Sequence, residues 1–300
     1  MVRLDLHTVV ESGPVHWAEP WRPGDAWLGG GTYLFSEPQP HLRRLRDLSS
    51  AGWVPLTVRP EGLEIAATCT VAQLSRFGLP GAWAANQGLV TQCCRAFLAS
   101  FKIWNMATIG GNLANSLPAG PMISLTAALD GVCLLRALDG GERRLPVAEL
   151  VTGAGRNALG QGELLRSVTL PDAALRGRTA FRRASLHEHG RSAALLIGRT
   201  DPADGSLTLT VTASTVRPVV LWFPLHPGAA ALRRAIESAV PEGSWFDDIH
   251  GLPQWRRHMT LRLAEEIRRE LATATGATAA TAAPAATATP TSGAEGTACG

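Results

Sequence analysis

Short apolar runs separated by glycine and proline turns make up most of residues 20–175, a pattern typical of a mixed helix and strand fold. Trp27-Leu28 and Leu63–Ala66 predict short strands, the first of which runs directly into a glycine turn. Helices are predicted over residues 42–48 (from Leu42, Leu45 and Leu48 at helical spacing), over 70–74 with Thr70 as N-cap, over Val90–Ser100, and over Met122–Leu129 after Pro121.

The pattern changes after Pro171. Ser206–Ala213 alternates apolar residues with serine and threonine, which predicts a half-buried antiparallel strand. Apolar residues share one helical face over 232–239, and they recur at intervals of four from Trp255 to Leu271. The last segment, 272–300, is almost entirely alanine, threonine, glycine and proline, and we expect a disordered tail there.

These elements predict an α+β fold in two units, with a boundary near residue 175. The first unit would cover residues 1–174, with an internal division near residue 58. The second, smaller unit would cover 175–271, and the tail 272–300.

Composition and charge exclude several classes of protein. Hydrophobic residues make up 45% of the 300 residues and charged residues 18%, which is typical of a globular chain. The net charge of +3 comes from scattered residues, so we expect no nucleic-acid partner. No apolar run is long enough for a membrane span, and residues 1–10 lack the apolar core of a signal peptide, so we expect a cytoplasmic protein.

The five cysteines do not have the spacing of a metal site. None forms a Cys-x-x-Cys pair, and Cys93 and Cys94 are adjacent. We interpret them as reduced thiols packed in the interior, and we expect no metal bound by this chain.

Two glycine-rich segments, far apart in sequence, are the main candidate chemistry. They are Gly29-Gly30-Gly31-Thr32 and Thr108-Ile109-Gly110-Gly111-Asn112. Consecutive glycines let the backbone approach a ligand closely, and successive N–H groups can converge on an anion. The neighbouring side chains are short, polar and uncharged, which suits a pyrophosphate held by neutral donors. The alternative is a pair of ordinary tight turns, since neither segment has the Gly-x-Gly-x-x-Gly spacing.

Both segments resemble motifs of one known family. Residues 27–34 are similar to the first flavin motif of the FAD-binding medium subunits of molybdenum hydroxylases, of the carbon monoxide dehydrogenase and xanthine dehydrogenase type. Residues 107–115 resemble the second motif almost letter for letter. Weaker similarity continues in the same order through Gly62–Ala67, Glu163–Pro171, Phe181–Ser185, Arg217–Val219 and Trp255–Met259.

The resemblance implies an FAD-binding domain of the PCMH type, built from two α+β subdomains, followed by a small α+β C-terminal domain. FAD would lie between the subdomains. Leu165 matches a leucine that packs on the isoalloxazine ring, and Arg182 matches a lysine near the flavin. The other implied contacts are Gly29, Gly30, Gly31, Thr32, Tyr33 and Leu34 on one side, and Thr108, Ile109, Gly110, Gly111, Asn112, Asn115 and Ser116 on the other.

Two segments depart from the family pattern. Leu117–Pro121 reads Leu-Pro-Ala-Gly-Pro where the family usually has Ser-Pro-Ala-Ala-Asp, so a serine and a cofactor-binding aspartate are missing. Tyr33 stands in place of an aspartate in the first motif. Loss of one polar anchor would cost about 1–3 kcal/mol if its partner stays unpaired.

The function implied by the resemblance is electron transfer within a heteromeric enzyme. A large molybdenum-cofactor subunit would oxidise substrate, a small subunit with two [2Fe-2S] clusters would pass the electrons on, and FAD on this chain would give them to NAD, a quinone or oxygen. The complex could be a dimer of heterotrimers. The sequence shows no acid–base pair, so we assign no catalytic residue. Two alternatives are a structural subunit that has lost FAD and a stand-alone flavin oxidoreductase.

Four other groups of residues have both a functional and a structural interpretation. His187 and His189 could converge on a metal, but we favour a solvated loop because no third ligand is evident. For Asp247, Asp248 and His250 we favour a capping or interface role over acid–base chemistry. Finally, we assign the tryptophans at 17, 21, 27, 53 and 83 to the core or to a subunit interface rather than to flavin stacking, and Cys93-Cys94 to an inert pair.

Overall fold

The structure, a computed structural model, describes residues 11–280. Segments 1–10 and 281–300 lie outside the described residues, and with them the predictions about a signal peptide and about most of the tail. The strands are β1 (Glu11–Pro14), β2 (Asp25–Leu28), β3 (Arg44–Asp47), β4 (Leu56–Arg59), β5 (Gly62–Ala66), β6 (Val132–Arg136), β7 (Glu142–Pro146), β8 (Val151–Gly153), β9 (Arg156–Asn157), β10 (Leu164–Pro171), β11 (Arg178–Ala184), β12 (Ala194–Thr200), β13 (Leu207–Thr212) and β14 (Val219–Phe223). The α-helices are α1 (Val71–Arg76), α2 (Gln87–Ala96), α3 (Phe101–Met106), α4 (Ile109–Asn115), α5 (Pro121–Ala128), α6 (Val147–Leu150), α7 (Asp172–Arg176), α8 (Ala229–Ala239) and α9 (Pro253–Ala280).

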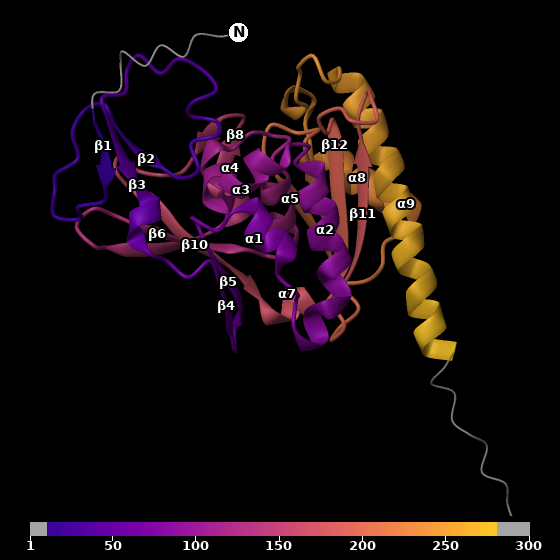
Figure 1. Cartoon of the computed structure of the whole chain (residues 1–300). Helices are drawn as coiled ribbons and strands as arrows, with labels where there is room; N and C mark the ends of the chain where they lie inside the picture. The colour runs from indigo at the N-terminus through magenta and orange to yellow at the C-terminus, as the bar shows by residue number, and fades with distance from the viewer. Residues whose placement is uncertain (1–10, 281–300) are drawn as a thin grey trace, which may run out of the picture.

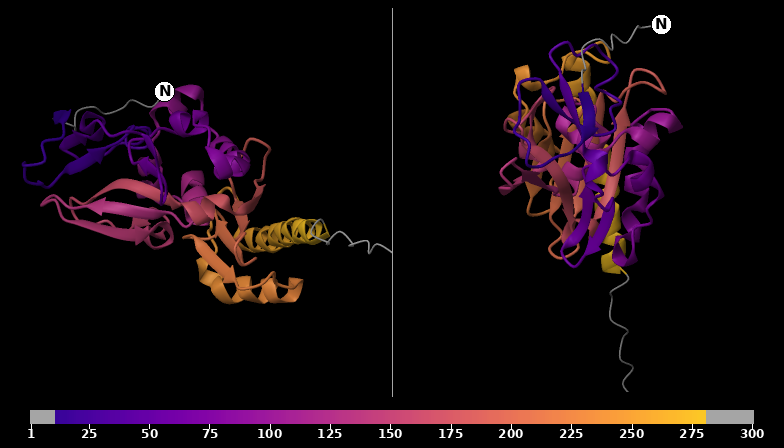
Figure 2. Two further views of the ribbon diagram at one scale, coloured as in Figure 1. Left: turned by 90° about the horizontal axis from the view of Figure 1, so that it is seen from below. Right: turned by 60° about the vertical axis from the view of Figure 1, so that its left-hand side comes forward.

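The described strands form three larger sheets and one small hairpin. The first sheet is parallel, in the order β1-β3-β2, and the second is antiparallel, in the order β4-β5-β10-β6-β7. The third is the antiparallel meander β11-β12-β13-β14, and β8 pairs with β9. The first two sheets lie at one end of the molecule, while α8 and α9 lie at the other end, against the third sheet (Figures 1 and 2).

Helix α5 lies at the centre of the molecule. All eight of its residues are buried, and it packs against α2 and α4 on one side and against β12 and β13 on the other. The Ser124 hydroxyl lies 2.6 Å from the Thr212 hydroxyl, and the Ala213 amide donates to the Pro118 carbonyl at 2.9 Å. The helices α1–α5 and the third sheet therefore share one packed interior.

Strand β13 is the strand predicted over 206–213, but it is not half-buried. All six of its residues, including three threonines, are buried. The third sheet is covered by α5 on one face and by α9 on the other. Neither face of its central strands is therefore exposed to solvent, and the alternation of apolar and polar residues along β13 does not separate buried from exposed positions.

The helix predicted over residues 42–48 is absent, and this expectation was wrong. Residues 44–47 form β3, the central strand of the first sheet, and a short 3₁₀ turn follows from Leu48. All three leucines at 42, 45 and 48 are buried as the pattern required. Parallel pairing with β1 and β2 on both sides supplies the backbone hydrogen bonds that a helix would have made locally.

Other local predictions are confirmed with shifted ends. Thr70 caps α1 in a capping box with Gln73, and Pro121 opens α5. The helix predicted over 90–100 is α2, which ends at Ala96, because Leu98 has a positive φ of 45° and Ser100 caps the next helix. Helix α9 continues past Leu271 to Ala280, since alanine extends an existing helix without a new nucleation cost.

Among the described residues, no helix has both the length and the apolar character that crossing a bilayer requires.

A buried arginine fixes the packing of α9 on the third sheet. The Arg256 side chain is 1% exposed, and it donates to the carbonyls of Gly251, Ala193 and Ala213 at 2.6–2.8 Å and to the Asp248 carboxylate. Asp248 also accepts from the His250 amide at 2.8 Å, and the capping or interface role that we favoured for it stays a prediction. Three loops converge on this one guanidinium.

We expect Arg256→Leu to destabilise the protein by about 3–5 kcal/mol, because it leaves a partly buried carboxylate and three carbonyls without their donor. Arg257→Leu, at the next position, is the matched control. The Arg257 side chain is half-exposed and pairs with Glu237, a contact worth less than about 1 kcal/mol. Urea denaturation of both variants measures the difference, and equal midpoints would contradict this role of Arg256.

Candidate functional site

The first glycine segment (Gly29–Leu34) begins directly after β2, and its backbone N–H groups donate no hydrogen bond within the described residues. Among the hydrogen bonds of residues 11–280, none has an amide of residues 29–34 as donor; the next amide, of Phe35, bonds to the Gly31 carbonyl at 2.9 Å. All residues of the segment are partly or fully exposed. A row of undonated amides at the surface is the arrangement that binds phosphate oxygens without charged side chains.

Each glycine of this segment is required by what lies next to it. A Cβ on Gly30 would lie 1.5 Å from the Met106 carbonyl oxygen, and one on Gly29 would lie 2.9 Å from Thr108 Oγ1. Gly31 has a φ of +70°, and a Cβ there would meet the Phe35 ring at 2.5 Å. The first segment is therefore packed against the chain that leads into the second, and the two glycine-rich segments lie side by side.

The second segment is the first turn of α4 rather than a turn between strands. Thr108 is the N-cap, and its hydroxyl accepts from the Gly111 amide at 3.0 Å. The Ile109 and Gly110 amides donate to the carbonyls of Cys69 and Ala67 at 2.8 and 2.9 Å. These donors are already paired within the protein, so α4 has fewer free backbone donors than the sequence predicted.

The two glycines of α4 are each required by a different close contact. A Cβ on Gly110 would lie 2.4 Å from Ala67 Cβ, so Gly110 lets the helix approach the loop after β5. A Cβ on Gly111 would lie 2.9 Å from Thr108 Oγ1 and would disturb the cap. Gly111 is exposed, on the outer side of the turn.

Three polar side chains follow in or just after α4, and they differ in availability. Asn112 Oδ1 accepts from the Met122 amide at 3.2 Å, which caps α5 because Gly120 at its N-cap has no side chain and Pro121 has no N–H. Ser116 is fully buried, has a φ of 50°, and donates to the Leu113 carbonyl at 2.8 Å. Asn115 is half-buried, and no hydrogen bond of its side chain is found within residues 11–280.

Leu165 lies on β10, a strand that contacts α4, whereas Arg182 lies away from both glycine segments. Leu165 is 4% exposed and packs in the core on β10, next to a bulge opposite β6. Arg182, on β11, is ion-paired with Glu266 and Glu270 of α9 at 3.1 and 2.7 Å. Strand alternation puts Arg182 on the α9 face of the third sheet, whereas α5 and the glycine segments lie beyond the opposite face.

An ion-pair cluster below the first glycine segment was not predicted from the sequence. Asp25, the first residue of β2, faces Arg44 across the strand pair, and the two are joined by bonds of 2.7 and 2.8 Å. The Arg44 hydrogen bond lowers the pKa of Asp25 to about 2. Arg46 lies 3.2 Å from Asp25, and its guanidinium stacks on Trp21 and Trp27. The signal that could have found the cluster is alternating charge in two short strands.

The tryptophans of the N-terminal region form a structural cluster. Trp17 stacks on Trp53 with ring centroids 6.4 Å apart, and Arg136 and Arg166 cap the two rings at 5.3 and 4.2 Å. Arg136 is on β6 and Arg166 on β10, so the cluster joins the first sheet to the second. Trp83 is buried and donates to Asp172 at 2.8 Å.

The remaining candidate groups show no reactive geometry. Cys69, Cys93, Cys94 and Cys133 are free and buried, and burial raises the pKa of Cys69, Cys94 and Cys133 to about 12, so these thiols stay protonated at neutral pH. Cys299 lies outside the described residues. Within residues 11–280 no group of three or more potential metal ligands is found, and His187 and His189 lie in the exposed β11–β12 loop.

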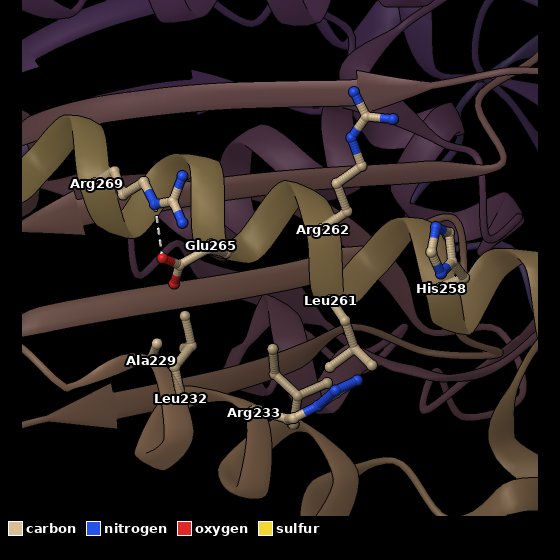
Figure 3. A pocket seen from close by; sticks show the side chains of 9 residues that line it. Ala229, Leu232, Arg233, His258, Leu261, Arg262, Glu265 and Arg269 are labelled. Carbon is tan, nitrogen blue, oxygen red and sulfur yellow. Dashed lines mark hydrogen bonds and ion pairs between the residues drawn. The ribbon is translucent and has the colours of Figure 1, made fainter.

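A hollow lies between α8 and α9 (Figure 3), and no residue of the two glycine segments lines it. It measures about 370 Å³, and its floor includes Leu232 and Leu261. The arginines around it are ion-paired within the protein, as Arg269 is with Glu265 at 2.8 Å and Arg262 with Glu266 at 3.2 Å. It lies on the α9 side of the third sheet, so we do not assign the cofactor to it.

Comparison with known proteins identifies the family. The model of the FAD-binding domain in molybdopterin dehydrogenase matches residues 22–173, half of the chain. The chain therefore belongs to the family of FAD-binding domains of molybdopterin dehydrogenases. The caffeine dehydrogenase subunit beta of Pseudomonas sp. (strain CBB1) is 33% identical over 108 residues, a match that spans 35% of this chain and 36% of that subunit.

Solved structures share the fold over most of the chain. Quinoline 2-oxidoreductase from Pseudomonas putida 86 matches 84% of this chain and 90% of that chain, with a TM-score of 0.67 and 18% identity. Carbon monoxide dehydrogenase from Hydrogenophaga pseudoflava matches 86% and 96%, with a TM-score of 0.68 and 16% identity. The enzyme from Oligotropha carboxidovorans matches 82% and 90%, with a TM-score of 0.67 and 21% identity. The α+β fold predicted from the sequence is confirmed.

Gly30→Ala tests the contact between the two glycine segments. The added methyl group would meet the Met106 carbonyl at 1.5 Å, so the segments must separate. We expect at least about tenfold weaker FAD binding and a loss of about 2–4 kcal/mol of stability. FAD titration and urea denaturation measure the two effects.

The control is Gly88→Ala in α2, where nothing lies within 4 Å of the new Cβ. This change should leave FAD binding unchanged and stabilise the helix slightly. Equal behaviour of the two variants would contradict the steric argument.

Asp25→Asn tests the ion-pair cluster through its pH dependence. The pKa of Asp25 falls from 3.8 to about 2 on folding, so its carboxylate stabilises the fold above pH 3.8 and this contribution is lost as the pH falls toward 2. We expect Asp25→Asn to cost about 2 kcal/mol at pH 7 and progressively less below pH 4. Urea denaturation from pH 7 to pH 3 measures the difference. Glu188→Gln, in the exposed β11–β12 loop, should show no such trend.

Proposed function

We propose that this chain is the FAD-binding subunit of a heteromeric molybdenum hydroxylase. In this proposal it passes electrons from iron–sulfur clusters on a small partner subunit, through FAD, to an external acceptor, while a large molybdenum-cofactor subunit oxidises the substrate. The observation that carries the proposal is the row of undonated amides from Gly29 to Leu34, held against the chain before α4 in a domain of the FAD-binding family.

The residues present fit a pyrophosphate on one side. The amides of Gly29–Leu34 would donate to its oxygens, with the Thr32 hydroxyl and the Asn115 side chain as further donors. Neutral amides can hold two phosphates without a counter-charge, because several N–H dipoles point at the same anion. When bound, FAD would supply exchange between one-electron and two-electron steps. The protein would position the cofactor and limit its contact with water.

We further propose the domain division made from the sequence. The FAD-binding unit would cover residues 1–174, with its internal division near residue 58, and the C-terminal unit would cover 175–271. The family match over residues 22–173 supports the first boundary. We also propose that the complex works in the cytoplasm, and that its subunits assemble as a dimer of heterotrimers.

A second candidate is a structural subunit that keeps the fold but has lost FAD. It is favoured by the pairing of the α4 amides within the protein, and by Leu117 and Pro121 at positions where the family carries a serine and an aspartate. On this alternative, the contacts on the α4 side would be too few to hold the cofactor.

Cofactor content separates the two candidates. The purified protein should carry stoichiometric FAD, released on denaturation and identified by chromatography. FAD added at 100 times its dissociation constant should stabilise the protein by about 2.7 kcal/mol. A colourless protein whose melting temperature does not respond to FAD would establish the structural candidate instead.

A further inference from the structure

The short helix α3 is unusual because none of its residues is buried. It follows α2 and leads directly into α4, and Trp104 is its one side chain packed against the core. Lys102 and Asn105 are exposed polar residues of this helix. Its other exposed side chains are apolar, as is the preceding Leu98: Phe101 is 73% exposed and Met106 55% exposed, and Ile103 and Leu98 are also exposed. We call these four residues the α3 surface.

The α3 surface borders the glycine segment. The Met106 carbonyl is the group against which Gly30 packs, and Ala107 and Thr108 follow immediately. Tyr33 and Phe35, in and just after that segment, add two further exposed aromatic rings. Exposed apolar groups that gather at one place, rather than singly, are characteristic of an interaction site.

The charge around the α3 surface has one sign. The sequence from Ile65 to Leu129 contains no aspartate or glutamate, and its charged residues are Arg76, Arg95 and Lys102. All three are exposed. An apolar centre with a cationic rim and no carboxylates is complementary to an apolar patch with an acidic rim.

We propose that the α3 surface is the docking surface for an acidic protein subunit, namely the small iron–sulfur subunit that would deliver electrons to this chain. This inference rests on the proposed function for the identity of the partner. The apolar residues at 98, 101, 103 and 106 form the centre of the contact, and the cations at 76, 95 and 102 pair with partner carboxylates. A partner seated there lies beside the segment proposed to hold FAD.

Lys102 permits a direct test because it is the single lysine among the 300 residues. A zero-length carbodiimide cross-link joins an amine to a carboxylate, and the amines that this chain supplies are Lys102 and its N-terminus. We expect mass spectrometry of the cross-linked complex to join Lys102 to an aspartate or glutamate of the iron–sulfur polypeptide. Acylation of Lys102 should also be at least about tenfold slower in the complex than in the free chain.

Variants distinguish docking from mere proximity. Lys102→Arg keeps the charge, so it should abolish the cross-link and leave assembly intact. Phe101→Glu should lower the iron recovered per chain at least about tenfold, because a carboxylate replaces the apolar centre beside an acidic partner. Leu225→Glu is the matched control: Leu225 is 74% exposed and lies after β14, away from α3, and iron recovery should be unchanged.

Three outcomes would overturn the docking inference. Lys102 that reacts equally fast in the complex and in the free chain would exclude docking at α3, as would normal iron recovery with Phe101→Glu. A cross-link to a second copy of this chain would assign the surface to self-association. FAD per chain is measured in parallel: complexes that lack FAD but protect Lys102 would refute the flavin role and leave the docking surface standing.

Discussion

The contact between Gly30 and the Met106 carbonyl is the constraint on which the site depends. A Cβ at position 30 would lie 1.5 Å from that oxygen, so no other residue allows the two backbones to approach this closely. The contact joins the end of β2 to the start of α4, elements that are far apart in sequence. The amides of Gly29–Leu34 donate no hydrogen bond within the described residues, so in the proposed function close packing and ligand binding would arise from the same absence of side chains.

The sheet that presents this segment is small, and electrostatic and aromatic contacts supplement its core. Parallel strands of four residues bury little apolar surface. Asp25 and Arg44 pair across β2 and β3, and Arg46 packs between two indole rings. Trp17 and Trp53 then join this sheet to β6 and β10 through stacked arginines. The position of the glycine segment relative to the rest of the domain is therefore fixed by contacts that involve charge as well as burial.

Local signals in the sequence were sufficient where the structure is determined locally. The capping box at Thr70 and the proline that opens α5 could be predicted because their physical causes lie within one helical turn. The strand β3 could not, since its hydrogen bonds come from β1 and β2. Likewise, Thr108–Asn112 resembles a turn because of its glycines, but a cap at Thr108 and the packing of Gly110 on Ala67 make it a helix start. Strand alternation alone would have placed Arg182 with Ala180 and Ala184, on the α9 face.

The unequal use of amides in the two segments changes where an anion would be stabilised. The first-turn donors of α4 are paired with Ala67, Cys69 and its own cap, so in the proposed function the glycine segment after β2 would provide most of the direct hydrogen bonds to the anion. The chain on the α4 side of this segment contributes no carboxylate, since none occurs between Ile65 and Leu129, and the Asp25 carboxylate of β2 is paired with Arg44 and Arg46. Within a Debye length of about 10 Å, removing acidic groups strengthens the binding of any anion without adding a cation. One compositional bias would therefore favour both a pyrophosphate at the glycine segment and an acidic protein at α3, because both ligands are anionic and the two surfaces adjoin.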